Sequence, residues 1–167
     1  LGGGYPELHA ARLAANQSLA AQLRASADAG MPIYGECGGF IYLGRSPRTV
    51  DGVRHPMSGV LPMDFTMDPR HLVIRYTELT ALDASLLGRG GSVLRGQEFH
   101  QSRIVATELE PRLFRTRTSD GQVLLDGYTR QGVVAGYTHL HFGGPGATVA
   151  EAFVEAAVRW RTTAGSA

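Results

Sequence analysis

The stretch that most constrains the fold is MPIYGECGGFIYL, residues 31–43, in which glycines frame the single cysteine of the chain. The short apolar run at residues 32–36 is typical of a buried strand, and the apolar residues after Cys37 predict the first turns of a helix. A tight turn from a strand into a helix pushes its central side chain out of the sheet. Glycine is needed there because neighbouring segments come close together. The stretch therefore predicts a strand–turn–helix unit of an α/β sheet, with a thiol at its tip.

The segments before this turn continue the same pattern. Residues 1–4 predict the end of a strand and a glycine-rich turn, and Pro6 suits the first turn of a helix. We expect that helix over residues 7–29, with Gly30 at its C-cap. The apolar positions close to one face of it are Leu8, Leu13, Leu19 and Leu23. Alternation of strands and helices favours a parallel α/β sheet.

The rest of the chain predicts a different organisation. Residues 49–80 alternate Gly and Pro with short runs such as HLVIRYTEL, which indicates antiparallel strands added to the sheet. EFHQSRIV, after Gly96, predicts another strand, and residues 123–142 predict a hairpin whose last strand carries two histidines. A final helix is expected from about Val149 to Arg161. Its apolar face would be Val149, Phe153, Ala156, Ala157 and Trp160. We expect one domain over residues 1–167, because we find no repeat or linker.

Composition excludes some classes of function. The formal net charge is +1 and the arginines are scattered, so neither nucleic acid nor an anionic membrane is indicated as a partner. No apolar stretch approaches the ~20 residues that span a bilayer. A single cysteine cannot form an internal disulfide, which fits the cytoplasm.

Cys37 is the candidate nucleophile. At a helix N-terminus the thiolate is favoured over the thiol, and the first N–H groups can receive an oxyanion. The alternative is a buried cysteine that packs as a small hydrophobic residue. The flanking glycines make this alternative less favourable, because a core strand gains nothing from them.

Six histidines are candidates for the base that such a thiol needs. His139 and His141, in GYTHLHFGG, end a predicted strand, where sites in α/β sheets assemble, and an extended strand would place both on one face. Metal binding by this pair is a weaker alternative, since a zinc site needs more ligands. His100, in RGQEFHQS, stays a candidate. Surface or structural roles are expected for the others, His9, His55 and His71.

Four motifs together resemble one family: LGGGYPELHA at 1–10, GECGGFIYL at 35–43, LRGQEFHQS at 94–102 and YTHLHF at 137–142. The chain is similar to the glutaminase domain of cobyrinic acid (or hydrogenobyrinic acid) a,c-diamide synthases. These are class I glutamine amidotransferases of the triad type. The resemblance implies a flavodoxin-like α/β sheet with helices on both faces and an antiparallel elaboration.

The resemblance also implies roles for individual residues. Cys37 would attack the side-chain amide of glutamine, and His139 would be its base. The oxyanion hole would come from the N–H of Gly38 and that of Gly3 or Gly4. No cofactor or metal is expected in this domain.

The third member of the triad is open. Many class I amidotransferases place Glu two residues after the catalytic histidine, where this chain has His141. The orienting group could be His141, another carboxylate such as Glu98, or none. Glu98 and His100 would lie near the glutamine site or face the synthetase domain, but a strand whose polar residues satisfy each other is an equal alternative.

We expect this chain to be the C-terminal part of a longer ligase. A strand–helix–strand unit that begins the sheet would precede Leu1. The chain has no G-x-x-x-x-G-K-[ST] phosphate loop. In the family an ATP-binding synthetase domain, with Mg, activates the corrinoid carboxylates for cobalamin biosynthesis, and ammonia comes from glutamine. The alternative hypotheses are a non-catalytic regulatory or assembly domain, a related Cys–His amidotransferase acting on another carboxylate, and a thiol hydrolase or protease acting on another acyl group.

Overall fold

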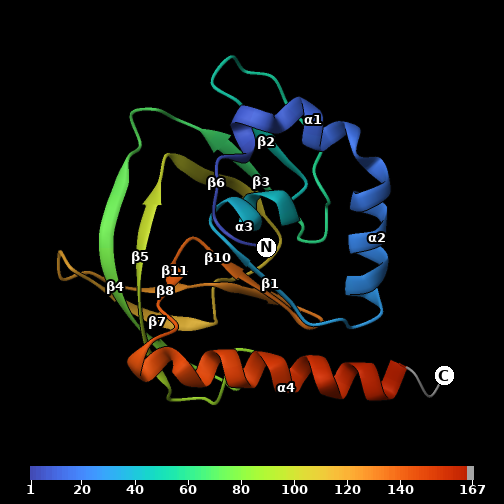
Figure 1. Ribbon diagram of the computed structural model, residues 1–167. Coiled ribbons are helices and arrows are strands. Elements are labelled where there is room, and N and C mark those ends of the chain that lie inside the picture. Colours follow the sequence, from blue (N-terminus) through green and yellow to red (C-terminus); the bar gives the residue numbers. More distant parts are fainter. Residues whose placement is uncertain (165–167) are drawn as a thin grey trace.

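The computed structural model describes residues 1–164, which form a mixed α/β protein with three sheets (Figure 1). The helices are η1 (Pro6–His9), α1 (Ala10–Ala15), α2 (Gln17–Asp28), α3 (Gly38–Leu43), η2 (Gly144–Gly146) and α4 (Ala147–Ala164). The strands are β1 (Ile33–Glu36), β2 (Ser46–Arg48), β3 (Met63–Met67), β4 (Val73–Ala81), β5 (Val93–His100), β6 (Ser102–Thr107), β7 (Phe114–Thr118), β8 (Val123–Asp126), β9 (Tyr128–Arg130), β10 (Val133–Gly136) and β11 (His139–Leu140).

The parallel pair β1–β10 separates two hydrophobic cores. Ile33 pairs with Val133, and both point into a core shared with α2 and α3. Their neighbours Tyr34 and Val134 point the other way, into a core that includes Val149 of α4. Successive side chains of a strand alternate between faces, so each face receives its own helices. Helices therefore cover both faces of this pair, as expected.

The predicted hairpin is formed by β9 and β10. Gln131 and Gly132 at its tip have φ values of 46° and 84°, which a type I′ turn requires at both central residues. The strand expected to carry two histidines is shorter than predicted. β11 ends at Leu140 and pairs with β5 of another sheet, so only His139 lies in it and His141 follows its end.

The helix expected over residues 7–29 is divided into η1, α1 and α2. Asn16 interrupts it, because its side chain caps α2 by accepting a hydrogen bond from the Leu19 N–H at 3.2 Å. The predicted apolar face is confirmed at Leu13 and Leu23, which pack against buried residues, but not at the other two leucines. Leu8 and Leu19 are exposed, while small alanines, among them Ala20, are buried against the core. The glycine stop is confirmed one position beyond the cap: Ala29 is the C-cap of α2, and Gly30, with φ 78°, follows it in a Schellman turn.

Most strands in the middle of the chain pair antiparallel, as predicted, but β2 pairs with β3 in parallel. The five-stranded sheet has the order β11-β5-β4-β7-β8, and the three-stranded sheet has the order β2-β3-β6. β5 and β6 are consecutive but belong to different sheets, with Gln101 between them. This change of sheet brings residues 99–102 close to the turn that holds Cys37.

The C-terminal helix α4 is confirmed and is longer than expected. Val149 is buried, and Phe153 and Trp160 are half-buried, but Ala157 is exposed. Its apolar face therefore packs less completely than its sequence pattern indicates.

Candidate active site

Cys37 lies on a strained turn between β1 and α3. Its φ of 48° and ψ of −104° are rare for a residue with a side chain. Such a conformation costs about 1–3 kcal/mol and persists where surrounding contacts impose it. The Cys37 N–H donates to the Gly136 carbonyl at 2.9 Å, and the Ile41 N–H donates to the Cys37 carbonyl at 3.0 Å. The predicted strand–turn–helix is confirmed, with the thiol at the strained position.

The first residue of the chain lies alongside β1 as a strand would. The Leu1 nitrogen donates to the Tyr34 carbonyl at 2.8 Å, and the Glu36 N–H donates to the Leu1 carbonyl at 3.1 Å. In a parallel ladder, one residue bonds to the two residues that flank its partner on the next strand, as Leu1 does here on either side of position 35. This pairing fixes where the following glycines run.

Two glycines of the turn let this N-terminal segment approach closely. A Cβ atom on Gly38 would lie 2.5 Å from the Gly4 carbonyl oxygen, and one on Gly39 would lie 2.3 Å from the Leu1 oxygen. The Gly39 N–H also donates to the Gly2 carbonyl at 3.1 Å. Glycine is therefore required at 38 and 39 because backbone packs against backbone.

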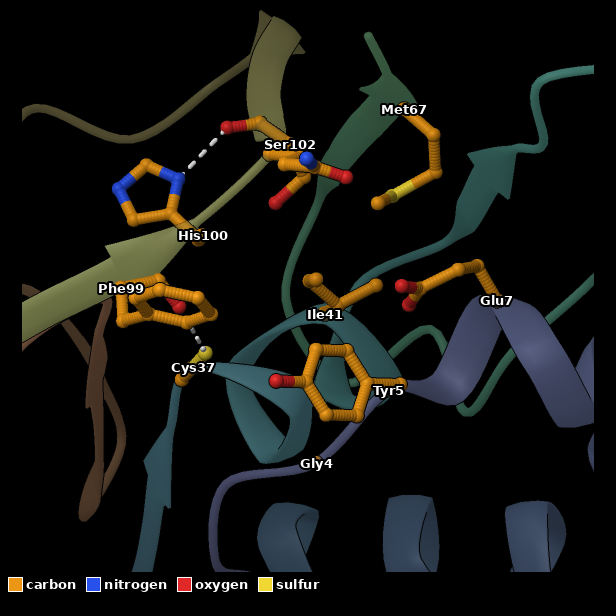
Figure 2. A pocket seen from close by; sticks show the side chains of 10 residues that line it. Gly4, Tyr5, Glu7, Cys37, Ile41, Met67, Phe99, His100 and Ser102 are labelled. Carbon is orange, nitrogen blue, oxygen red and sulfur yellow. Dashed lines mark hydrogen bonds between the residues drawn. The ribbon is translucent and has the colours of Figure 1, made fainter. Parts of the chain in front are cut away.

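A cavity of about 260 Å³ opens beside the thiol (Figure 2). It is lined by the N-terminal segment and η1, by the Cys37 turn, by the end of β3, and by the corner between β5 and β6. Apolar walls come from Ile41, Met67 and Phe99, and the exposed rim includes Tyr5. Cys37, the single thiol of the chain, thus lines this cavity.

The Cys37 side chain is 6% exposed, and its Sγ lies 3.7 Å from the Phe99 carbonyl oxygen, to which the thiol can donate. Burial raises the pKa of this thiol, and the carboxylates of Glu7 and Glu36 raise it further. The free site therefore holds a protonated thiol more than an isolated cysteine would, and needs a base.

Two backbone amides oppose this rise in the pKa of the Cys37 thiol. The N–H groups of Gly38 and Gly4 donate toward Cys37 and lower the pKa of its thiol. Donors that stabilise a thiolate are also placed for an oxyanion that develops beside it. Gly3, the other glycine considered, lies instead against His139, where an added Cβ atom would be 2.2 Å from the ring.

His139 is paired with a carboxylate that immediately precedes the thiol. Its Nδ1 atom lies 3.4 Å from Glu36 Oε1, and the Tyr34 hydroxyl donates to Glu36 Oε2 at 3.0 Å. Burial raises the pKa of Tyr34, so its hydroxyl stays protonated and can only donate to that carboxylate. The pairing places His139 next to the Cys37 turn, although its ring is not part of the cavity lining described above.

Glu98 and His100 form a buried polar cluster on the other side of the cavity. Arg75 pairs with Glu98 at 2.9 Å. His100 Nδ1 is 2.8 Å from the Ser102 carbonyl oxygen, and its Nε2 is 3.4 Å from Glu98 Oε2. The ring also stacks on Tyr137, with centroids 3.7 Å apart. Because both nitrogens face acceptors of the cluster, this geometry favours a supporting role for His100.

The remaining histidines do not line the cavity, although the ring of His71 lies 6.3 Å from that of His100. The His141 N–H donates to the Arg95 carbonyl at 2.8 Å, and its exposed ring packs against Gly143. His9, His55 and His71 are exposed or half-buried. Within residues 1–164 no group of three or more His, Cys, Asp or Glu side chains is placed to hold a metal ion.

The carboxylate beside His139 is the residue that sequence reasoning missed. His141 and Glu98 were the expected candidates for an orienting group, but the structure places Glu36 there. One signal was present: Tyr34 and Glu36 alternate with the buried Ile33 along β1, so they share one face. Which strand would meet that face could not be known without the fold.

In the described part of the chain, no helix is both long and apolar enough to cross a membrane.

Residues 1–147 match the model of the CobB/CobQ-like glutamine amidotransferase domain. The cobyrinate a,c-diamide synthase of Salmonella typhimurium is 39% identical over 145 residues, which are 85% of this chain and 31% of that protein. The hydrogenobyrinate a,c-diamide synthase of Brucella anthropi is 40% identical over 136 residues, which are 81% of this chain and 30% of that protein.

The chain thus spans about a third of the length of these relatives. A solved structure described as a glutamine amidotransferase superimposes with a TM-score of 0.57 at 20% identity, over 93% of this chain and 76% of that one. That likeness confirms the class I amidotransferase-like fold. Together with the match over residues 1–147, it shows that the chain belongs to the family of CobB/CobQ-like glutamine amidotransferase domains.

Proposed function

We propose that this chain is the glutaminase part of an ATP-dependent ligase that amidates the a and c carboxylates of cobyrinic or hydrogenobyrinic acid. The observation that carries the proposal is the strained Cys37 turn, where two backbone amides point at a thiol that lines a cavity. The names of the relatives supply the corrinoid substrates.

In the proposed reaction, Cys37 Sγ attacks the side-chain carbonyl carbon of glutamine after its proton passes to His139. The amides of Gly38 and Gly4 receive the oxyanion. His139 then returns the proton to the leaving nitrogen, the C–N bond breaks, and ammonia departs from a γ-glutamyl thioester. Water hydrolyses the thioester to glutamate and frees the thiol.

We assign Glu36 to the positioning of His139. A carboxylate on one ring nitrogen fixes the tautomer, so that the other nitrogen is left to exchange the proton. This replaces His141 and Glu98 as the proposed orienting group, and leaves Glu98 and His100 to support the cavity wall.

The other parts of the reaction would lie outside this chain. A synthetase domain would bind ATP, Mg and the corrinoid, and would use the ammonia released here. Cytoplasmic location stays a prediction from the single cysteine.

The test compares ammonia release from glutamine by wild type and Cys37→Ala, in the longest protein that carries this sequence. The same samples are treated with 6-diazo-5-oxo-norleucine, a glutamine analogue that alkylates the nucleophile, and are analysed by peptide mass spectrometry. We expect activity and adduct to disappear with the thiol. Activity that survives in Cys37→Ala would show that the nucleophile is misassigned. A folded wild type with neither activity nor adduct would favour the non-catalytic alternative.

A further inference from the structure

The cavity beside Cys37 contains one acidic side chain that the reaction above does not use. Glu7, on η1, extends into the cavity across from Cys37 (Figure 2). Its interactions are with its own backbone N–H and, at longer range, with the charge of His9. Among residues 1–164 it has no ion-pair partner.

The wall between these two residues is apolar. Figure 2 shows Ile41 between Cys37 and Glu7, and Met67 also lines the cavity. A ligand that spans the cavity would therefore lay a short hydrocarbon stem on this wall. Its two ends would meet a nucleophile at one side and a carboxylate at the other.

Burial disfavours the charged form of the Glu7 carboxylate. Burial raises the pKa of Glu7, which shows that its charge is incompletely solvated. Glu7 also raises the pKa of Cys37, so it opposes formation of the nucleophilic thiolate. A cation bound between the two would relieve both effects, and none of the lining side chains is a lysine or arginine.

We propose that Glu7 binds the α-ammonium group of L-glutamine and so sets the direction in which the substrate enters the cavity. The inference rests on the proposed function and adds a substrate-binding residue to it. Glutamine has the required form: two methylene groups separate its side-chain amide from the carbon that carries the ammonium group. The site would thus select α-amino acid amides over simple carboxamides, and substrate binding would itself favour the Cys37 thiolate.

A pair of substrates isolates this contact. Glutaramate is glutamine without its α-amino group, so it can reach Cys37 but cannot bind Glu7. In Glu7→Gln we expect kcat/KM for glutamine to fall roughly 10- to 100-fold, mainly through KM, because a charged hydrogen bond is lost. The value for glutaramate should not fall, and Glu7→Asp should recover part of the activity on glutamine. Glu151→Gln, on the exposed surface of α4, is the matched control and should change neither.

Alkylation of Cys37 supplies a readout that does not depend on turnover. 6-Diazo-5-oxo-norleucine carries an α-ammonium group, so Glu7→Gln should slow its reaction with Cys37. Iodoacetamide carries none, and removal of the negative charge lowers the pKa of the thiol, so its reaction near pH 7 should become faster. Opposite changes for the two reagents are the expected result.

A purely structural role for Glu7 predicts something else. If Glu7→Gln reduces glutamine and glutaramate turnover equally, or slows both reagents alike, the inference is overturned. Unchanged kcat/KM for glutamine would overturn it as well, while leaving the Cys37 mechanism intact. A wild type that neither hydrolyses glutamine nor takes the label on Cys37 would instead overturn the proposed function, and with it this inference.

Discussion

The nucleophile and the proposed base are held in different ways. Cys37 follows β1 of the three-stranded sheet β1-β10-β9, and its position is set by backbone packing against the N-terminal glycines. His139 lies on the two-residue strand β11 at the edge of the five-stranded sheet, and a side-chain contact with Glu36 ties it to the Cys37 turn. The nucleophile side should therefore be sensitive to added volume, and the base side to the removal of functional groups.

Removal of the base should have the largest effect. In His139→Asn no group is left to take the thiol proton, and we expect glutaminase activity to fall about 10²- to 10⁴-fold. His141→Asn is the matched control, because its exposed ring lies beyond the end of β11. Steady-state ammonia release measures both. If His141→Asn loses the activity and His139→Asn retains it, the base is misassigned.

Added volume on the nucleophile side should come next. In Gly38→Ala the new methyl group would lie 2.5 Å from the Gly4 oxygen, so the two oxyanion donors must move apart. We expect a loss of about 10²- to 10³-fold in kcat, with a destabilisation of about 1–3 kcal/mol in urea unfolding. Gly2→Ala should be nearly silent, because nothing lies within 4 Å of the place its methyl group would take. Equal losses in the two variants would refute the close-approach argument.

Glu36 acts on both His139 and Cys37, so its replacement should lower the activity and at the same time make the thiol more reactive. Glu36→Gln removes the charged partner of His139, for which we expect about a tenfold loss of glutaminase activity. The same change lowers the pKa of Cys37, because the Glu36 carboxylate raises it. Iodoacetamide should therefore label Cys37 faster near neutral pH in a less active enzyme. Slower labelling would show that Glu36 does not act on the thiol through its charge.

The smallest effect on rate is expected from the buried cluster behind the cavity, which should act mainly on stability. Burial by itself would raise the pKa of Glu98, but hydrogen bonding by His100 and the charge of Arg75 outweigh it and lower the pKa. This stabilisation is complete above about pH 4.5, the ordinary value for a glutamate, and is lost as the pH falls through the lower value of the folded state.

Arg75→Met tests the cluster. We expect it to cost about 1–3 kcal/mol at pH 7, because Glu98 loses its charged partner, and this cost should shrink as the pH falls below about 4.5, where the wild type loses the same stabilisation. Urea unfolding between pH 4 and 7 measures both. Arg159→Met removes an exposed ion pair on α4 and should cost less than about 0.5 kcal/mol. Equal costs would mean that the Arg75 pair is no better than a surface contact.

Sequence patterns predicted what depends on neighbours along the chain. The Cys37 turn and the Gly30 cap follow from local periodicity and turn chemistry, whereas EFHQSRIV, expected as one strand, is divided at Gln101 between β5 and β6 of two sheets. The interruption at Asn16 was missed although Asn is a common N-cap, because the helical pattern continues across it.

What depends on distant contacts was harder to predict. Leu19 was expected on the packed face, but the core accepts the small side chain of Ala20 there instead. Likewise, the position of His139 suggested a site at a strand end, whereas its contact with Glu36 joins residues 103 positions apart. Such pairings arise when two sheets meet, and no spacing in the sequence records them.

The contact of the N-terminal segment with the Cys37 turn has a consequence for how folding can be followed. The chain has a single thiol, and it is reached from outside through a cavity walled by Gly4 and Tyr5 of that segment. A bulky, charged disulfide reagent should react with Cys37 only when the segment detaches. The reaction rate would then report how often the N-terminal segment detaches from the Cys37 turn. No dye or tag would be needed, because the thiol itself shows whether the site is assembled.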